Sequence, residues 1–130
     1  MTPITDLREL LTSLAPSLAE REYVFCSVPD PSGVPPGIEV LATMREPEGL
    51  SLVATRQDAE RAGLAFEGPF RLIRLGVPSS LEAVGLTAAV ARALAAEGIS
   101  ANVIAAYHHD YILVPACRAH EALAALEGLT

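Results

Sequence analysis

The chain has 130 residues, of which 51% are hydrophobic and 19% charged, so it is long and apolar enough to form one compact domain with a buried core. This composition excludes a disordered or collagen-like protein, and a formal net charge of -7 without a single lysine excludes a basic surface for nucleic acid or anionic membranes. No apolar run reaches the roughly 18 residues of a membrane-spanning helix, and the N-terminal residues lack the pattern of a secretory signal, so we expect a cytoplasmic protein.

The N-terminal part predicts a helix, a strand and a stiff loop. Leucines at helical spacing over 6–15 predict a short amphipathic helix that begins at Thr5 or Asp6 and ends before Pro16. Aromatic and β-branched residues predict a strand over 22–28. The proline-rich run 29–37 that follows cannot form a strand ladder, because proline has no backbone donor.

A hairpin and a short helix come next. The strands predicted over 38–45 and 50–55 are separated by a turn that contains proline and glycine, the residues that such turns favour. Thr55 then begins a helix with Asp58 three residues further on, an acidic variant of the capping box, and Gly63 ends it.

From residue 70 onward the predicted order is βαββα. A strand over 70–75 leads into a helix that ends at Gly98, then into strands over 101–107 and 111–115 and a final helix over 118–127. The predicted buried positions are Leu86, Val90, Ala93 and Leu94 in the first helix and Ala119, Ala122, Leu123 and Leu126 in the second.

These elements predict an α+β fold, an antiparallel sheet with helices on one face. The order lacks the last strand of a βαββαβ unit, so we expect the open sheet edge to be filled by 22–28 or by a partner subunit. Because 38–76 has the order ββαβ, the tail of the same unit, the first half is interpreted as a partial second unit. The expected halves are therefore 1–68 and 69–130, which together form one compact unit.

The segment 84–99 resembles the core of an ACT domain, a module that senses small molecules. The pattern of this family is a strand, then Pro-Gly-Val-Leu, then a helix that ends in Ala/Glu-x-Gly-Ile. Gly85 and Gly98 have the spacing of this pattern, Ile99 follows the second glycine, and Val84 stands where the family has proline.

Other segments are similar to the branch of the family that includes the cytosolic arginine sensor of animals and many bacterial proteins. The segments that carry this similarity are 45–50, 79–88, 98–103 and 110–115. The resemblance extends over the chain from Tyr23 and is most specific over 70–115. It implies a bacterial protein of two degenerate ACT-like units with a ferredoxin-like fold.

The resemblance also implies a function. ACT domains commonly bind an amino acid beside the loop between the first strand and its helix, often at an interface between two domains. The implied protein is a non-enzymatic, amino-acid-binding regulator or sensor that forms a homodimer and carries no cofactor. The alternative is a ligand-free dimerisation or assembly module, whose sheet edges pair with another subunit.

The candidate ligand site follows from this position. A helix N-terminus offers unpaired backbone N–H groups and a partial positive charge, which suit a carboxylate, and Gly85 permits close approach. Asp110 lies where the arginine-sensor branch has an aspartate, so it could pair with a cationic group of the ligand. The candidate ligand-binding residues are Ser79, Ser80, Leu81, Glu82, Ala83, Val84, Gly85, Ile104, Ala105 and Asp110.

Structural interpretations compete with these roles. Ser79 and Glu82 have the spacing of a capping box, which would occupy both side chains without a ligand, and Asp110 could instead be an Asx-type turn residue.

Metal and catalytic sites have weak sequence support. His108 and His109 precede Asp110, but neighbouring strand residues point to opposite faces, so we expect hairpin polarity rather than a metal site or a small enzyme's active site. Cys26 and Cys117 lie far apart without metal-binding spacing, which favours reduced thiols.

Overall fold

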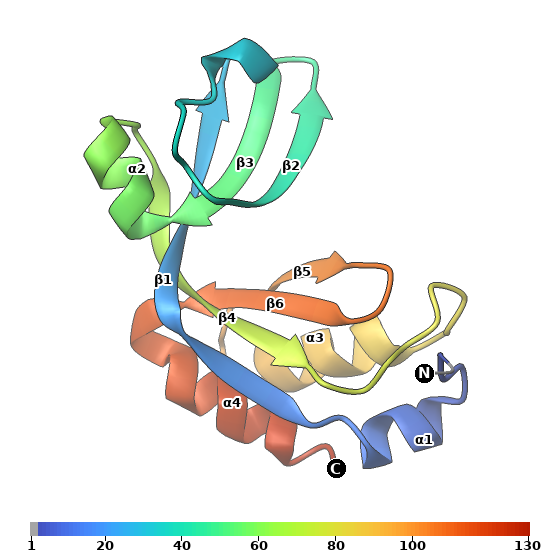
Figure 1. Cartoon of the computed structure of the whole chain (residues 1–130). Helices are drawn as coiled ribbons and strands as arrows, with labels where there is room; N and C mark the ends of the chain where they lie inside the picture. The colour runs from blue at the N-terminus through green and yellow to red at the C-terminus, as the bar shows by residue number, and fades with distance from the viewer. Residues whose placement is uncertain (1–2) are drawn as a thin grey trace. The chain divides into compact units, whose positions relative to one another are not determined.

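The computed structural model describes residues 3–130, which form two compact units (Figure 1). Unit 1 consists of the residues up to Glu20 together with Arg71–Thr130, and unit 2 of Arg21–Phe70. The sequence predicted one compact domain with residues 1–20 in its N-terminal half, whereas the structure places 3–20 with the C-terminal residues. Each unit has its own cluster of buried apolar side chains, which accounts for the division.

The sheet of the described residues has six strands, which are β1 (Pro16–Val28), β2 (Val40–Glu46), β3 (Gly49–Thr55), β4 (Glu67–Leu75), β5 (Asn102–Ala105) and β6 (Asp110–Pro115). They hydrogen-bond in the order β2-β3-β1-β4-β6-β5, so the strand order is β1-β4-β6-β5 in unit 1 and β2-β3-β1-β4 in unit 2. The elements of unit 1 are α1 (Leu7–Thr12), the first part of β1 (Pro16–Val28), the end of β4 (Glu67–Leu75), α3 (Leu86–Ala96), β5 (Asn102–Ala105), β6 (Asp110–Pro115), the 3-10 turn η2 (Ala116–Arg118) and α4 (Ala119–Glu127). Helices α3 and α4 pack against each other on one face of the sheet (Figure 1), which confirms the predicted α+β, ferredoxin-like fold.

The sheet edge of unit 1 that lacked a strand in the sequence is filled by this chain. The strand beside β4 is β1, whose residues up to Glu20 belong to unit 1, and Arg71 Nε donates to the Ala19 carbonyl at 2.9 Å. The strand begins at Pro16, earlier than the predicted 22–28. Residues 23–28 pair instead with β3 in unit 2, so the expected strand is correct but the part of it that fills the edge is different.

The core of unit 1 includes α1 as well as the sheet and the two long helices. Leu10 and Leu14 are fully buried, although α1 itself is short. Asp6 caps this helix by accepting a hydrogen bond from the Glu9 amide at 3.1 Å, as predicted. The predicted stripes of α3 and α4 are buried except for Ala93 and Leu123, which are half-buried.

Unit 2 contains the predicted hairpin and short helix. Its further elements are the 3-10 turn η1 (Pro31–Gly33), β2 (Val40–Glu46), β3 (Gly49–Thr55) and α2 (Arg56–Ala62). The η1 turn stands where a ferredoxin-like unit has its first helix, because the proline-rich run cannot supply one. Thr55 accepts from the Asp58 amide at 3.3 Å and Gly63 ends α2 with a φ of 72°, as the sequence predicted.

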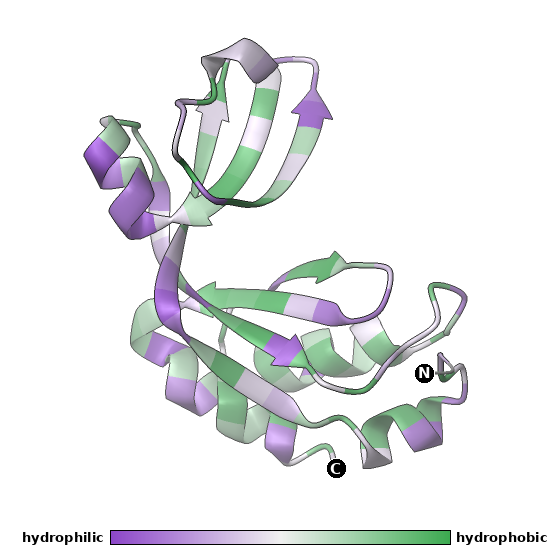
Figure 2. Ribbon diagram, in the orientation of Figure 1, coloured by the Kyte–Doolittle hydropathy of each residue, from purple (hydrophilic) through white to green (hydrophobic). Residues whose placement is uncertain are grey.

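The hydropathy of unit 2 follows its layers. Strand β3 is mostly hydrophobic, whereas α2, which packs against it, is mostly hydrophilic (Figure 2). Val24, Cys26 and Val28 alternate along β1 and are buried on the core side. Within residues 3–130, no helix has both the length and the apolar character needed to span a membrane.

Candidate functional site

The loop 76–85 connects β4 to α3 in unit 1. Helix α3 begins at Leu86, and its N-cap is Gly85, which has a φ of 100° and provides no side-chain cap. The predicted capping box is therefore wrong, because Ser79 and Glu82 lie before the cap position. The helix starts where its buried stripe starts, at Leu86, and not at the first serine of the loop.

Ser79 instead forms a hydrogen bond across unit 1. Its hydroxyl donates to Asp110 Oδ2 at 2.9 Å, and the two residues are only 5% and 7% exposed. Ala105 lies opposite Asp110 in the β5–β6 ladder, so three of the predicted site residues come together here. The Asp110 side chain thus bonds to a residue far away in the sequence. The sequence alone suggested for Asp110 either a contact with a ligand or a local turn.

The hairpin between β5 and β6 also contacts the loop, through its backbone and through the ring of His109. The Ser79 amide donates to the His108 carbonyl at 3.2 Å, and His109 Nδ1 lies 3.3 Å from the Val77 carbonyl. Through these contacts, His108 and His109 bond to residues of the loop and have a structural role there. Within residues 3–130, no group of three His, Cys, Asp or Glu side chains is arranged to hold a metal ion.

Asp110 lines a narrow apolar cavity together with the first residues of α3. The other lining residues are Leu75, Leu86, Thr87, Val90, Val103 and Ile112. The cavity is too narrow to hold a water molecule in this structure. A buried carboxylate nevertheless lies near the N-terminal end of α3, which carries unpaired backbone N–H groups and a partial positive charge.

The remaining predicted residues are not all near this cavity. Leu81 and Val84 are 65% and 83% exposed, and Glu82 is also exposed. Ser80 is half-buried, and its hydroxyl accepts from the Glu82 amide at 3.1 Å, which shapes the loop itself. Ala83 packs against the core, and Ile104 lies opposite Tyr111.

The N-terminal segment covers part of the loop, a contact that the sequence pattern does not indicate. Ile4 forms a parallel bridge with Ser79, and a Cβ added at Gly85 would lie 3.0 Å from Leu7 Cδ2. The close approach to Gly85 that we predicted for a ligand is therefore occupied by Leu7. The spacing of the leucines in α1 indicated a core-facing helix but carried no signal for this contact.

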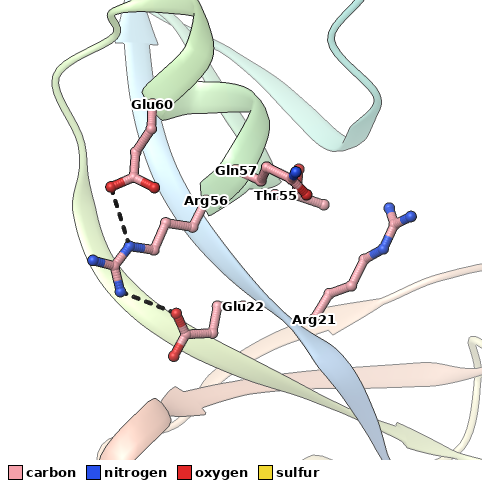
Figure 3. Close-up of a pocket in the computed structure, with 6 residues that line it drawn as sticks. All are labelled: Arg21, Glu22, Thr55, Arg56, Gln57 and Glu60. Atoms are coloured by element: carbon pink, nitrogen blue, oxygen red, sulfur yellow. Dashed lines mark hydrogen bonds and ion pairs between the residues drawn. The ribbon is translucent and has the colours of Figure 1, made fainter.

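A second concave surface lies in unit 2, where β1, the end of β3 and the start of α2 meet (Figure 3). It encloses about 320 Å³ and is lined by Arg21, Glu22, Thr55, Arg56, Gln57 and Glu60.

Three of the charged groups of this surface pair with one another (Figure 3), whereas Arg21 pairs with Glu39 outside it. Arg56 Nη1 lies 3.0 Å from Glu22 Oε1, and its Nε lies 3.5 Å from Glu60 Oε2. The hydrogen bond to Glu22 and the charge of Glu60 raise the pKa of Arg56. These side chains are well exposed, so the ion pairs contribute little to stability.

The cysteines and the remaining histidine lie outside both sites. Cys26 and Cys117 are free, as expected; burial raises the pKa of the Cys26 thiol, whereas Cys117 is exposed. His120 is exposed on α4.

The two units define the chain as a tandem of ferredoxin-like α+β modules. Sequence patterns of the ACT domain match residues 2–71 and 66–128, so the chain belongs to the ACT domain family. No curated protein matches the sequence.

Solved structures are similar over nearly the whole chain. A Vibrio cholerae protein of unknown function, described as a possible transport protein, is 49% identical, with a TM-score of 0.83 over 95% of this chain and 94% of that one. The regulatory subunit of aspartate kinase from Thermus thermophilus, in its ligand-free form, is 14% identical, with a TM-score of 0.68 over 91% and 98%. The second similarity shows a common fold only.

Proposed function

We propose that the chain is a non-enzymatic regulatory protein that binds a free amino acid at loop 76–85 of unit 1. The observation that carries this proposal is the buried Asp110 carboxylate, which accepts from Ser79 and lines one cavity with the first residues of α3, whose start has no side-chain cap. A carboxylate and a set of free amide donors are the two groups that an α-amino acid requires.

The chemistry of the site favours a ligand with a cationic group. A buried carboxylate whose partner is a neutral hydroxyl loses hydration without gaining an opposite charge, so an ammonium or guanidinium beside it would gain a charge-assisted hydrogen bond. The α-carboxylate of the ligand would accept from backbone amides in the first turn of α3. This preference agrees with the resemblance to the arginine-sensor branch, which we retain as part of the proposal.

The cellular setting is also proposed. ACT domains that bind amino acids often do so between two copies, and the fold is shared with a regulatory subunit of aspartate kinase, so we propose a cytoplasmic homodimer whose geometry or stability changes with the ligand. The proposed protein needs no metal or other cofactor for this role.

A thermal-shift screen with each of the twenty free amino acids and with small amines tests the proposal. A ligand at about 100 times its dissociation constant stabilises the folded state by roughly 2.7 kcal/mol if it binds only that state. Asp110→Asn keeps the shape of the side chain and removes its charge, so it should weaken ligands with a cationic side chain more than neutral ones. The proposal fails if no amino acid raises the melting temperature and calorimetry detects no heat of binding.

One set of observations favours a ligand-free assembly module instead. Leu81, Val84 and Tyr107 are large apolar side chains that are 65%, 83% and 75% exposed, and β5 is an edge strand of the sheet. Sedimentation without added ligand, compared between the wild type and Leu81→Ser, distinguishes the two functions. A dimer that Leu81→Ser dissociates, in a protein that binds no amino acid, would establish the assembly module.

A further inference from the structure

The N-terminal strap, residues 4–8, lies across the proposed ligand loop. The Ile4 amide donates to the Pro78 carbonyl at 2.9 Å, and the Ser80 amide donates to the Ile4 carbonyl at 3.0 Å. These two bonds hold the strap on both sides of Ser79, the residue that reaches Asp110. The strap is thus bonded directly to the proposed site.

Leu7 is the strap residue that covers the start of α3. Gly85 has no side chain, and the position where a Cβ would stand is 3.0 Å from Leu7 Cδ2 and 3.7 Å from Leu7 Cδ1. A ligand carboxylate that approaches the Gly85 backbone would need the same space. Leu7 and the ligand therefore cannot both occupy it.

We propose that the strap is an autoinhibitory closure of the ligand loop and that Leu7 must leave Gly85 before a ligand can bind. The inference rests on the proposed function, because it concerns access to that site.

The strap is suited to move without unfolding the unit. Thr5, Asp6 and Arg8 are exposed and Leu7 is 36% exposed, so Leu7 and the half-buried Ile4 are the strap residues that give up apolar contact when the strap lifts. Leu10 within α1 and Leu14 just after its end are fully buried and anchor the chain on the other side. The boundary between the movable and the anchored part thus falls within α1.

Closure of this kind lowers the apparent affinity. When only a fraction of the molecules is open, the apparent dissociation constant rises by the inverse of that fraction. Leu7→Ala removes the side chain that fills the space at Gly85. The backbone bonds of Ile4 can still form in the variant, but they open more often without the Leu7 contact. We expect Leu7→Ala to tighten ligand binding by roughly threefold to tenfold. This is the range expected when most wild-type molecules are closed and most molecules of the variant are open.

Calorimetric titration of the full chain with the twenty free amino acids, starting with L-arginine because Asp110 suits a cation, provides the test. Leu11→Ala is the matched control, because it makes the same change on the same helix at a half-buried position away from Gly85. Hydrogen exchange of the Ser80 amide, which donates to Ile4, reports the strap directly. Its exchange should accelerate when the ligand is added and should be faster in Leu7→Ala without ligand.

The outcomes separate the two proposals. Tighter binding by Leu7→Ala with an unchanged Leu11→Ala supports the strap. If the wild type binds an amino acid and Leu7→Ala binds it equally well or more weakly, the strap proposal is wrong and the proposed function stands. If neither the wild type nor Leu7→Ala binds any of the twenty amino acids, the proposed function fails and the strap proposal fails with it.

Discussion

Ser79 and Asp110 show how one hydrogen bond stabilises both a loop and a buried charge. Ser79→Ala would leave the Asp110 carboxylate without the hydroxyl that donates to it at 2.9 Å, and a buried acceptor that loses its partner costs about 1–3 kcal/mol. Ser80→Ala removes only a bond within the loop and should cost less than about 1 kcal/mol. Urea unfolding of the two variants measures the difference, and equal stabilities would show that the Ser79–Asp110 bond does not form in solution.

A comparison of substitutions at Gly85 and Gly98 separates the effect of the Leu7 contact on stability from the effect of backbone strain. Both have a positive φ, which costs an L-residue about 1–2 kcal/mol, but only Gly85 has a side chain within reach of an added Cβ. Gly85→Ala should therefore destabilise the protein by about 1 kcal/mol more than Gly98→Ala. Adding Leu7→Ala to Gly85→Ala should recover that excess in chemical denaturation. No recovery would mean that Leu7 does not lie against Gly85.

The placement of the candidate site residues could be predicted from the sequence only where local pattern decides it. The family resemblance pointed to the loop before α3 and to Asp110, and the structure places these together with Ser79 and Ala105. The capping box failed because Ser79 reaches a residue 31 positions away, a pairing that local spacing does not contain. The contact of Leu7 with Gly85 was missed for the same reason.

At the scale of elements, α2 is held by Asp58, which accepts from the Glu39 amide at 3.0 Å and pairs with Arg61. The amide of Glu39 and the charge of Arg61 hold the pKa of Asp58 below its usual range. A carboxyl whose pKa is lower in the folded state contributes stability above its unfolded pKa, and that contribution is lost as the pH falls through the folded pKa.

Asp58→Asn should therefore be less stable than the wild type at neutral pH. Its amide oxygen can still accept from Glu39, so the loss measures the charge. The difference in free energy of unfolding should shrink steadily as the pH falls below the usual range for a carboxyl and vanish once Asp58 is protonated in both states. Urea titrations at neutral pH and near pH 3 provide the measurement, and a difference that does not change with pH would contradict the prediction.

Elements that depend on nearby residues were predictable, and those that depend on distant pairing were not. The β2–β3 hairpin and α2 follow from a Pro-Gly turn, Thr55 and Gly63, all within a few residues of the elements they bound. The early part of β1 is different, because 16–22 includes a proline and three charged residues and has no strand pattern of its own. It becomes a strand through its pairing with β4, which lies far away in the sequence.

For the whole molecule, the consequence is that unit 1 depends on a strand from outside its C-terminal segment, whereas unit 2 is one continuous stretch, Arg21–Phe70. Unit 1 has the elements of a βαββαβ module in the order β4, α3, β5, β6, α4, with β1 as a last strand that comes from the N-terminus. The ACT pattern over 66–128 therefore lacks that strand, and it also lacks Leu10 and Leu14 of the core.

A fragment of residues 66–130 should consequently fail to fold, because it exposes a sheet edge and leaves cavities where two core leucines are missing. Each fully buried leucine contributes about 2–5 kcal/mol to stability. A permuted chain that joins 71–130 through a flexible linker to 3–20 restores the order βαββαβ and should unfold cooperatively, as followed by circular dichroism in urea. The same permuted chain with Leu10→Ala and Leu14→Ala is the control and should unfold at a lower urea concentration or not fold at all. A cooperative transition in the 66–130 fragment would show that the N-terminal strand and helix are dispensable, and that unit 1 is specified by its C-terminal residues alone.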